Sequence, residues 1–250
     1  MKKASFIGHE RPLLCAMVQD GTPDDMVCTI CNAIGDGAEA LGIQLEYLHE
    51  GLCTEDNIRK IFQYCRGLPI YVTAYRRPGW EDKDCADMLL LAAKCGATMC
   101  DVMGDMFHPE PHEVTYDGAA VAKQKQLIAQ LHEAGSEVLM SSHLHAFYRE
   151  PDVYKFARAQ EERGADVVKI VNFSETEEEL IENLRICIGL KRAIRKQYLY
   201  LANGEQCGIL RRIGGSLGCC MYLCVERYTG MTSKEQPLLR SMRAVRDNMG

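Results

Sequence analysis

The residue best suited to covalent chemistry is Lys169, which lies near the end of the apolar run Gly164–Ile170. Alternate side chains of a strand point to the same side, so Val167 and Lys169 share one face. If that face is buried, the lysine loses the hydration of its ammonium form, and the free amine is a nucleophile that forms a Schiff base with a carbonyl group. The alternative is a lysine that reaches solvent from the end of the strand.

His143 follows a second apolar run, 138–142, which precedes the lysine segment. Histidine titrates near neutral pH and suits proton transfer at a carbon atom next to an iminium. If the two runs form neighbouring strands, the side chains of His143 and Lys169 meet at the same end. His145 is a second candidate, and either histidine could instead be a packed or solvated loop residue.

Charged residues at the ends of other apolar runs predict a site for an anionic ligand. Arg76 and Arg77 follow one predicted strand, and Arg211 and Arg212 precede another. A guanidinium group binds carboxylate or phosphate through two hydrogen bonds, although each arginine alone is more commonly a surface residue. Glu46, at the end of a further run, could orient hydroxyl groups or a partner base, or could form a structural ion pair.

Two segments have the composition of weak metal sites. Cys28–Cys31 is a single CxxC, and His108–His112 holds two histidines in a proline-rich loop. Neither has further ligands at the spacing typical of zinc sites, so we predict no metal. Glycines in 204–208 and 214–218 could form a phosphate cradle or simply tight turns.

Eight apolar, strand-like runs alternate with helical segments along the chain. The predicted strands are 12–18, 43–48, 69–75, 97–103, 137–142, 165–171, 198–202 and 218–224. The predicted helices are 23–41, 54–65, 82–95, 118–134, 151–163, one that starts at a capping box of Ser174 and Glu177 and ends near Arg195, a short one within 211–217, and 236–248.

This alternation predicts an α/β fold, a (β/α)₈ TIM barrel that forms one domain over residues 1–250. Chemistry in such barrels gathers at the C-terminal ends of the strands, which is where the polar residues above lie. A doubly wound open sheet is the competing fold. It normally has a glycine-rich turn after the first strand, and 19–23 has no GxGxxG pattern.

Composition excludes several classes of protein. The 250 residues hold 29 Lys and Arg against 35 Asp and Glu, a net charge of −6, which argues against nucleic-acid binding. No run approaches the roughly 20 apolar residues that span a bilayer. The first ten residues lack an apolar segment, so we expect no secretory signal and a cytoplasmic protein whose thirteen cysteines are free thiols.

The segments 138–143 and 164–170 resemble the Ser-x-His and Gly-Ala-Asp-x-Val-Lys motifs of type I 3-dehydroquinate dehydratase, the Schiff-base enzyme of the shikimate pathway and of aromatic amino acid biosynthesis. The resemblance extends over nearly the whole chain. Further similar segments are 43–46 and 73–76, like the family's second and third strands, 210–218, like its Ser-Arg-x-x-Gly…Gly segment, and 232–236, like its closing loop.

The resemblance implies that Lys169 forms an iminium with the ketone of 3-dehydroquinate. His143 would help to form and break it, would take the proton next to the iminium carbon, and would protonate the departing hydroxyl. The products would be 3-dehydroshikimate and water. The iminium draws electrons from the neighbouring carbon, so neither a metal nor a cofactor is implied.

The resemblance also implies a substrate-binding set and an assembly. Arg211 would hold the carboxylate of a small anionic keto acid, while Glu46, Arg76 and Gln236, together with Thr232 of the closing loop, would orient the carboxylate and hydroxyls. Homodimers are common in the family, so we expect a homodimer.

Several positions depart from the family pattern. Leu48 stands at a substrate-facing arginine position, Glu81 is displaced by one residue from the acid after the third strand, and Met103 replaces an acid of the fourth strand. Lys234 and Glu235 replace Pro-Gly in the closing loop. The alternatives are therefore a related lyase acting through an iminium on another keto acid, a class I aldolase of sugar phosphates, and a non-catalytic barrel that binds a carboxylate.

Overall fold

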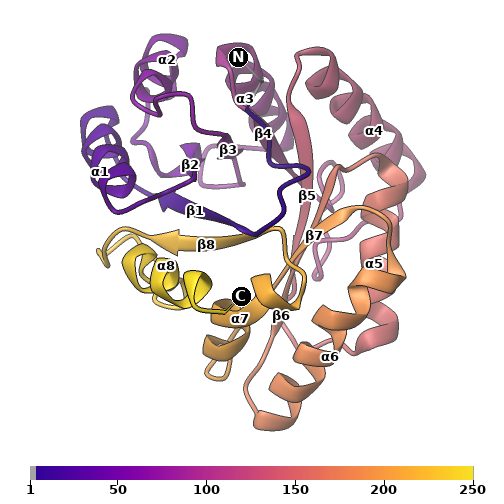
Figure 1. Ribbon diagram of the computed structural model, residues 1–250. Coiled ribbons are helices and arrows are strands. Elements are labelled where there is room, and N and C mark those ends of the chain that lie inside the picture. The colour runs from indigo at the N-terminus through magenta and orange to yellow at the C-terminus, as the bar shows by residue number, and fades with distance from the viewer. Residues whose placement is uncertain (1–3, 250) are drawn as a thin grey trace.

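The computed structural model describes residues 4–249, in which parallel strands alternate with helices around a barrel (Figure 1). The strands are β1 Leu13–Val18, β2 Ala40–Gln44, β3 Ile70–Thr73, β4 Met99–Met103, β5 Glu137–His143, β6 Val167–Phe173, β7 Gln197–Asn203 and β8 Met221–Val225. The helices are α1 Pro23–Gly35, the short 3₁₀ helix η1 Leu45–Tyr47, α2 Glu55–Gln63, α3 Asp82–Cys95, α4 Gly118–Glu133, α5 Glu150–Arg163, α6 Glu177–Ala193, α7 Gly208–Leu217 and α8 Leu239–Asp247.

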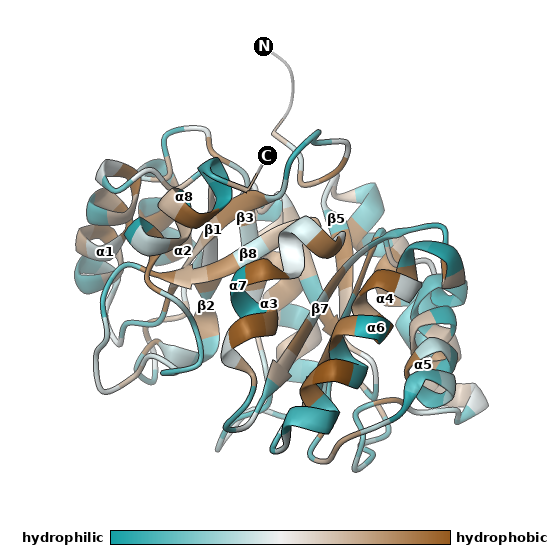
Figure 2. Cartoon of the chain, turned by 60° about the horizontal axis from the view of Figure 1, so that its bottom comes forward, coloured by the Kyte–Doolittle hydropathy of each residue, from teal (hydrophilic) through white to brown (hydrophobic). Residues whose placement is uncertain are grey.

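The eight strands form one sheet in the order β7-β6-β5-β4-β3-β2-β1-β8, which curls so that β7 and β8 come together. At this seam the Cys220 amide, one residue before β8, donates a hydrogen bond to the Tyr198 carbonyl of β7 at 2.9 Å. The predicted (β/α)₈ barrel is confirmed, and the doubly wound alternative is wrong. In Figure 2 the surrounding helices carry hydrophobic residues alongside hydrophilic ones, as helices that pack one face against a barrel do.

The barrel interior is packed by alternate residues of the strands. Val167 and Tyr71 belong to one buried cluster with Phe6, whose ring meets the edge of Tyr71 at 6.4 Å near the N-terminal ends of the strands. Lys169 and Val171 continue the inner face of β6 and line a cavity at the opposite end. The predicted strand face is therefore correct, and it carries Lys169 to the end of the barrel where chemistry is expected.

Several predicted element boundaries are wrong for local physical reasons. Helix α6 begins after Thr176, whose hydroxyl accepts the Glu179 amide at 3.2 Å, and not at Ser174, whose amide is bonded to the Asn203 carbonyl. Strand β2 ends at Gln44, so Glu46 lies in η1 and not in a strand. The first helix ends at Gly35 instead of residue 41, because residues 40–43 pair with β1.

The seventh helix is a regular one of ten residues, α7, although its glycines predicted only a short helix. Gly214 and Gly215 are buried there, and a Cβ built on Gly215 would lie 2.4 Å from the ring of Tyr222. These glycines allow α7 to pack closely on β8, so residues 214–217 form part of a helix and neither the phosphate cradle nor the tight turns considered for 214–218.

We expect Gly215→Ala to lower the free energy of unfolding by about 1–3 kcal/mol, because the methyl group must displace the buried Tyr222 ring. Urea denaturation measures the change. Gly35→Ala is the matched control: a Cβ there meets nothing within 4 Å, so the helix-favouring alanine should leave stability equal or raise it by up to about 1 kcal/mol. Equal effects of the two substitutions would contradict the packing argument.

Candidate active site

A cavity of about 500 Å³ opens at the C-terminal ends of the strands. Five of the predicted site residues line it: Lys169, His143, Glu46, Arg211 and Gln236. They come from β6, β5, η1, α7 and the segment after β8, so the barrel gathers residues separated by up to 190 positions in the sequence, from Glu46 to Gln236. Other lining residues are Met17, Gln19, Gln44, Tyr47, Thr73, Tyr75, Arg77, Val171, Leu201, Asn203, Leu223 and Ser233.

Lys169 is buried, with 4% of its surface exposed, so the interpretation as a solvent-reaching lysine is wrong. Its Nζ donates hydrogen bonds to the Tyr75 hydroxyl at 2.8 Å, to the Tyr71 hydroxyl at 3.1 Å and to Asp101 Oδ2 at 3.2 Å. Asp101 is completely buried. A buried ammonium requires such a counter-charge, because an unpaired ion in a protein interior costs several kcal/mol.

The two tyrosines also bind the same carboxylate, since the hydroxyls of Tyr71 and Tyr75 both donate to Asp101 Oδ2. Burial, and next the negative charge of Asp101, raise the pKa of both phenols well above the usual value of 10. They are therefore neutral donors. The sequence analysis missed Tyr71, Tyr75 and Asp101. Alternation along 69–75 puts the two tyrosines on one face, and Asp101 is a carboxylate within the apolar run 97–103, so both features were signals in the sequence.

His143 is held by Glu113, a residue of the β4–α4 loop that the sequence analysis did not single out. Glu113 Oε2 lies 2.9 Å from Nδ1 of His143 and accepts the His143 backbone amide at 2.8 Å. Burial raises the pKa of Glu113, but the hydrogen bonds and charge of His143 outweigh it and leave the pKa below its usual value. A proton on Nδ1 shared with this carboxylate leaves Nε2 free to act as a base.

Glu113 has a left-handed backbone with φ of 47°, which a residue other than glycine adopts only at a cost of about 1–2 kcal/mol. The surrounding structure must therefore fix the loop 104–117. One fixing group is the buried guanidinium of Arg163 from α5, which donates to the Gly104 and Thr115 carbonyls at the two ends of the loop. Gln124 of α4 donates to the Gly104 and Met106 carbonyls at 3.1 and 2.9 Å.

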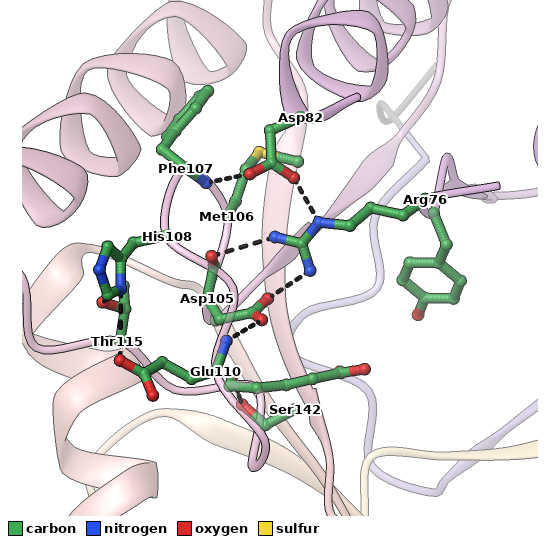
Figure 3. A network of polar contacts seen from close by, with 12 residues as sticks. Arg76, Asp82, Asp105, Met106, Phe107, His108, Glu110, Thr115 and Ser142 are labelled. Atoms are coloured by element: carbon green, nitrogen blue, oxygen red, sulfur yellow. Dashed lines mark hydrogen bonds and ion pairs between the residues drawn. The ribbon is translucent and has the colours of Figure 1, made fainter. Parts of the chain in front are cut away.

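Arg76 fixes the same loop from outside and does not line the cavity, contrary to its predicted role in substrate binding. Its guanidinium binds Asp82 at 2.5 Å and the Asp105 side chain at 2.9 Å (Figure 3). The two carboxylates in turn accept the backbone amides of Phe107 and Glu110 at 2.7 and 2.8 Å. Asp82 at the start of α3 and Asp105 in the loop after β4 thus hold Arg76 away from the cavity.

Arg77, not Arg76, is the arginine of this pair that lines the cavity. Its Nη1 donates to the Glu46 and Leu48 carbonyls at 2.8 and 2.5 Å, and its guanidinium lies 4.1 Å from the centre of the Trp80 ring. Leu48 itself is completely buried in the hydrophobic core outside the barrel. A guanidinium is therefore present beside position 48 even though the residue there is leucine.

Glu46 lies in a polar wall across the cavity. Its carboxylate accepts hydrogen bonds from Gln44 Nε2 and from the Thr73 hydroxyl, each at 2.9 Å. Burial raises the pKa of Glu46 despite these bonds. Within residues 4–249, the buried side-chain oxygens of Gln19, Gln44 and Gln236 lack hydrogen-bond partners. These three acceptors line the cavity, where hydroxyl groups of a ligand could satisfy them.

Arg211 and the closing loop form the remaining side. Arg211 is buried, and its guanidinium donates to the Ala202 carbonyl at 2.7 Å and to Asn203 Oδ1 at 2.6 Å, which fixes its plane. Thr232 does not line this cavity: its hydroxyl is bonded to the backbone of Thr229, and the neighbouring Ser233 is the lining residue instead.

The weaker candidates lie elsewhere. His145 is exposed, and His112 stacks on Phe156 with 5.2 Å between ring centres. Arg212 is on the surface, where it donates to the Gly208 carbonyl. Across residues 4–249, no group of three or more His, Cys, Asp or Glu side chains is placed to hold a metal ion, and no helix is long and apolar enough to cross a membrane.

Comparison with known proteins places the chain in a family. The sequence model of type I 3-dehydroquinase matches residues 14–245. The chain belongs to this family. Type I 3-dehydroquinases are hydro-lyases of the shikimate pathway, so the predicted assignment is confirmed. A comparison with curated proteins found no matching sequence.

Solved structures of 3-dehydroquinases share the fold at low identity. The enzyme of Geobacillus kaustophilus is 15% identical with a TM-score of 0.82, and the match covers 96% of this chain and 92% of that one. The type I enzyme of Clostridium difficile, determined with covalently modified comenic acid, is 12% identical with a TM-score of 0.82 and coverages of 96% and 93%. The Enterococcus faecalis enzyme is 12% identical, with a TM-score of 0.79 and 98% of both chains covered.

We expect Arg163→Met to destabilise this dehydroquinase by about 2–4 kcal/mol, because it leaves buried carbonyls of the loop 104–117 without a donor. Urea denaturation gives the change, and hydrogen exchange should rise in that loop. Arg158→Met on the exposed side of the same helix is the control and should change stability by less than about 0.5 kcal/mol. A similar loss for both variants would contradict the role given to Arg163.

Proposed function

We propose that the protein dehydrates 3-dehydroquinate through a Schiff base on Lys169. The observation that carries the proposal is a buried lysine in a polar cavity that is also lined by His143, whose ring is paired with the carboxylate of Glu113. The amine attacks the substrate ketone and water leaves, which gives an iminium. The iminium withdraws electrons from the neighbouring C–H bond, so that a base of modest strength can remove its proton.

His143 is the base in this scheme. Nε2 takes the proton from the carbon next to the iminium carbon, and the electron pair forms a C=C bond as the hydroxyl on the following carbon leaves. The same histidine returns its proton to that hydroxyl, which departs as water. Glu113 fixes the ring through Nδ1 and stabilises the imidazolium that exists between the two transfers. Hydrolysis of the iminium releases 3-dehydroshikimate and restores Lys169.

The rest of the cavity suits a small, hydroxylated keto acid. Arg211 supplies a fixed guanidinium for the carboxylate, and the Gln236 amide lies on the same lining. The wall of Glu46, Gln44 and Thr73 can accept hydrogen bonds from hydroxyl groups on the far side of the substrate ring. Arg77 takes the place of the arginine that is missing at position 48.

A second candidate is a lyase with the same iminium chemistry that acts on a different keto acid. It is favoured by the outward turn of Arg76, which leaves the preceding residue, Tyr75, to line the cavity just after the end of β3. Turnover of 3-dehydroquinate with a low KM would exclude it.

We also propose that the protein is a cytoplasmic homodimer. All thirteen cysteines have free thiols, as expected in a reducing compartment, and homodimers are common in the family.

Borohydride reduction tests the covalent step. We expect incubation with 3-dehydroquinate and sodium borohydride to add one substrate- or product-derived group to the protein, located on Lys169 by peptide mapping. Lys169→Met should form no adduct and should lose activity by at least about a thousandfold. Full activity in that variant, or an adduct on another lysine, would overturn the proposed function.

We expect Glu113→Gln to lower kcat by about 10²-fold or more with little change in KM, because the neutral amide no longer stabilises the imidazolium. The matched control is Glu81→Gln. Glu81 lies one residue from the acid in the family pattern, but it is exposed and caps α3. If Glu81→Gln lost the activity and Glu113→Gln kept it, the pairing of Glu113 with His143 would not matter for catalysis.

A further inference from the structure

A directed chain of hydrogen bonds leads away from the reactive nitrogen. Lys169 Nζ donates to the Tyr75 hydroxyl at 2.8 Å, and that hydroxyl donates to Asp101 Oδ2 at 2.6 Å. The Tyr75 hydroxyl is thus placed to accept one proton and to give another, and Asp101 is the final acceptor. The chain can therefore move a proton from the ammonium to the carboxylate without any group changing position.

Tyr71 bonds to the same two groups but differs from Tyr75 in one respect. Both hydroxyls contact Lys169 Nζ and Asp101. Tyr75 lines the cavity, however, whereas Tyr71 packs among the hydrophobic residues beneath the lysine. Tyr75 also meets the ring of His143 edge-on, with 5.4 Å between ring centres. Its hydroxyl is thus the member of the network next to both the amine and the substrate space.

Asp101 can hold the transferred proton at the end of this chain. Asp101 is completely buried, and its second oxygen, Oδ1, lacks a hydrogen-bond partner among the described residues. Two buried opposite charges become two neutral groups when the proton moves from Lys169 to Asp101, and this removes the desolvation cost of both ions. The neutral amine is the form that attacks a ketone.

We propose that Tyr75 is a catalytic residue that carries the proton to and from Lys169 Nζ, with Asp101 as the store. Tyr75 accepts a proton from the ammonium as its own proton passes to Asp101. The free amine then forms the N–C bond, the carbonyl electron pair moves to oxygen, and one N–H proton follows it. The proton stored on Asp101 returns through Tyr75 to the resulting hydroxyl, the C–O bond breaks, and water leaves.

The sequence balances without an outside acid or base. The starting pair is an ammonium and a carboxylate, and the final pair is a protonated iminium and the same carboxylate. Asp101 is thus the counter-ion of the nitrogen at both stages. The inference rests on the proposed function and adds to it: Tyr75 and Asp101 carry the proton of the nitrogen. His143, which by the family resemblance helps to form and break the iminium, also serves the carbon and the departing hydroxyl.

Timed borohydride quenching separates these roles. Enzyme and 3-dehydroquinate are mixed and reduced after increasing delays, and intact mass gives the rate of adduct formation. We expect Tyr75→Phe to slow adduct formation by at least about 100-fold. Tyr71→Phe removes an equivalent bond to Asp101 without touching the cavity, so its rate should be at least about tenfold higher than that of Tyr75→Phe. Circular dichroism and thermal unfolding establish that each variant is folded.

His143→Gln provides the opposite case, because the hydrogen bonds of Lys169 Nζ go to Tyr71, Tyr75 and Asp101 and not to His143. We expect this variant to accumulate the adduct faster than Tyr75→Phe does, yet to release no product. Adduct formation in His143→Gln no faster than in Tyr75→Phe would overturn the inference, because the histidine would then be the main proton carrier for the nitrogen. Adduct formation at the wild-type rate in Tyr75→Phe would overturn it too. In both cases the wild-type adduct would leave the proposed function intact, whereas its absence would remove both.

Discussion

The pairing of Lys169 with Asp101 inside the barrel is the interaction on which the site depends. A buried lysine on the inner face of β6 requires a carboxylate nearby, and Asp101 of β4 supplies it. The same carboxylate then binds two phenols from β3 and its C-terminal end, so a network of four side chains fills the upper barrel where other barrels place aliphatic layers. This network fixes the nitrogen in one position.

Next to this centre, His143 is oriented by a carboxylate that comes from a loop and not from a strand. The loop 104–117 brings Glu113 to His143, and groups from two helices and from Arg76 hold that loop. The left-handed backbone of Glu113 is strained, and this strain is needed to direct its carboxylate at His143. The active site therefore depends on polar contacts well outside the cavity, and a scan for residues that touch substrate would overlook Arg163 and Arg76.

The sequence was sufficient for the barrel and for the positions of Lys169 and His143, because strand alternation and the period of the elements are local signals. It was insufficient for Arg76, since whether the first or second arginine of a pair turns inward depends on Asp82 at the start of α3 and Asp105 in the loop after β4. Glu113 was out of reach for the same reason: a long loop has no periodicity from which to infer the direction of a side chain.

The seam between β7 and β8 is the place where the circle of strands is held together most weakly. Lys169 and Arg211 belong to the β6–α7 side, while Gln236 follows β8 on the other side, and the Cys220–Tyr198 hydrogen bond crosses the gap between the two strands. In the proposed reaction, a substrate bonded covalently to Lys169 and hydrogen-bonded to Gln236 would bridge this gap. Substrate would in this way complete the closed circle of strands, and the enzyme would be at its stiffest while the reaction is under way.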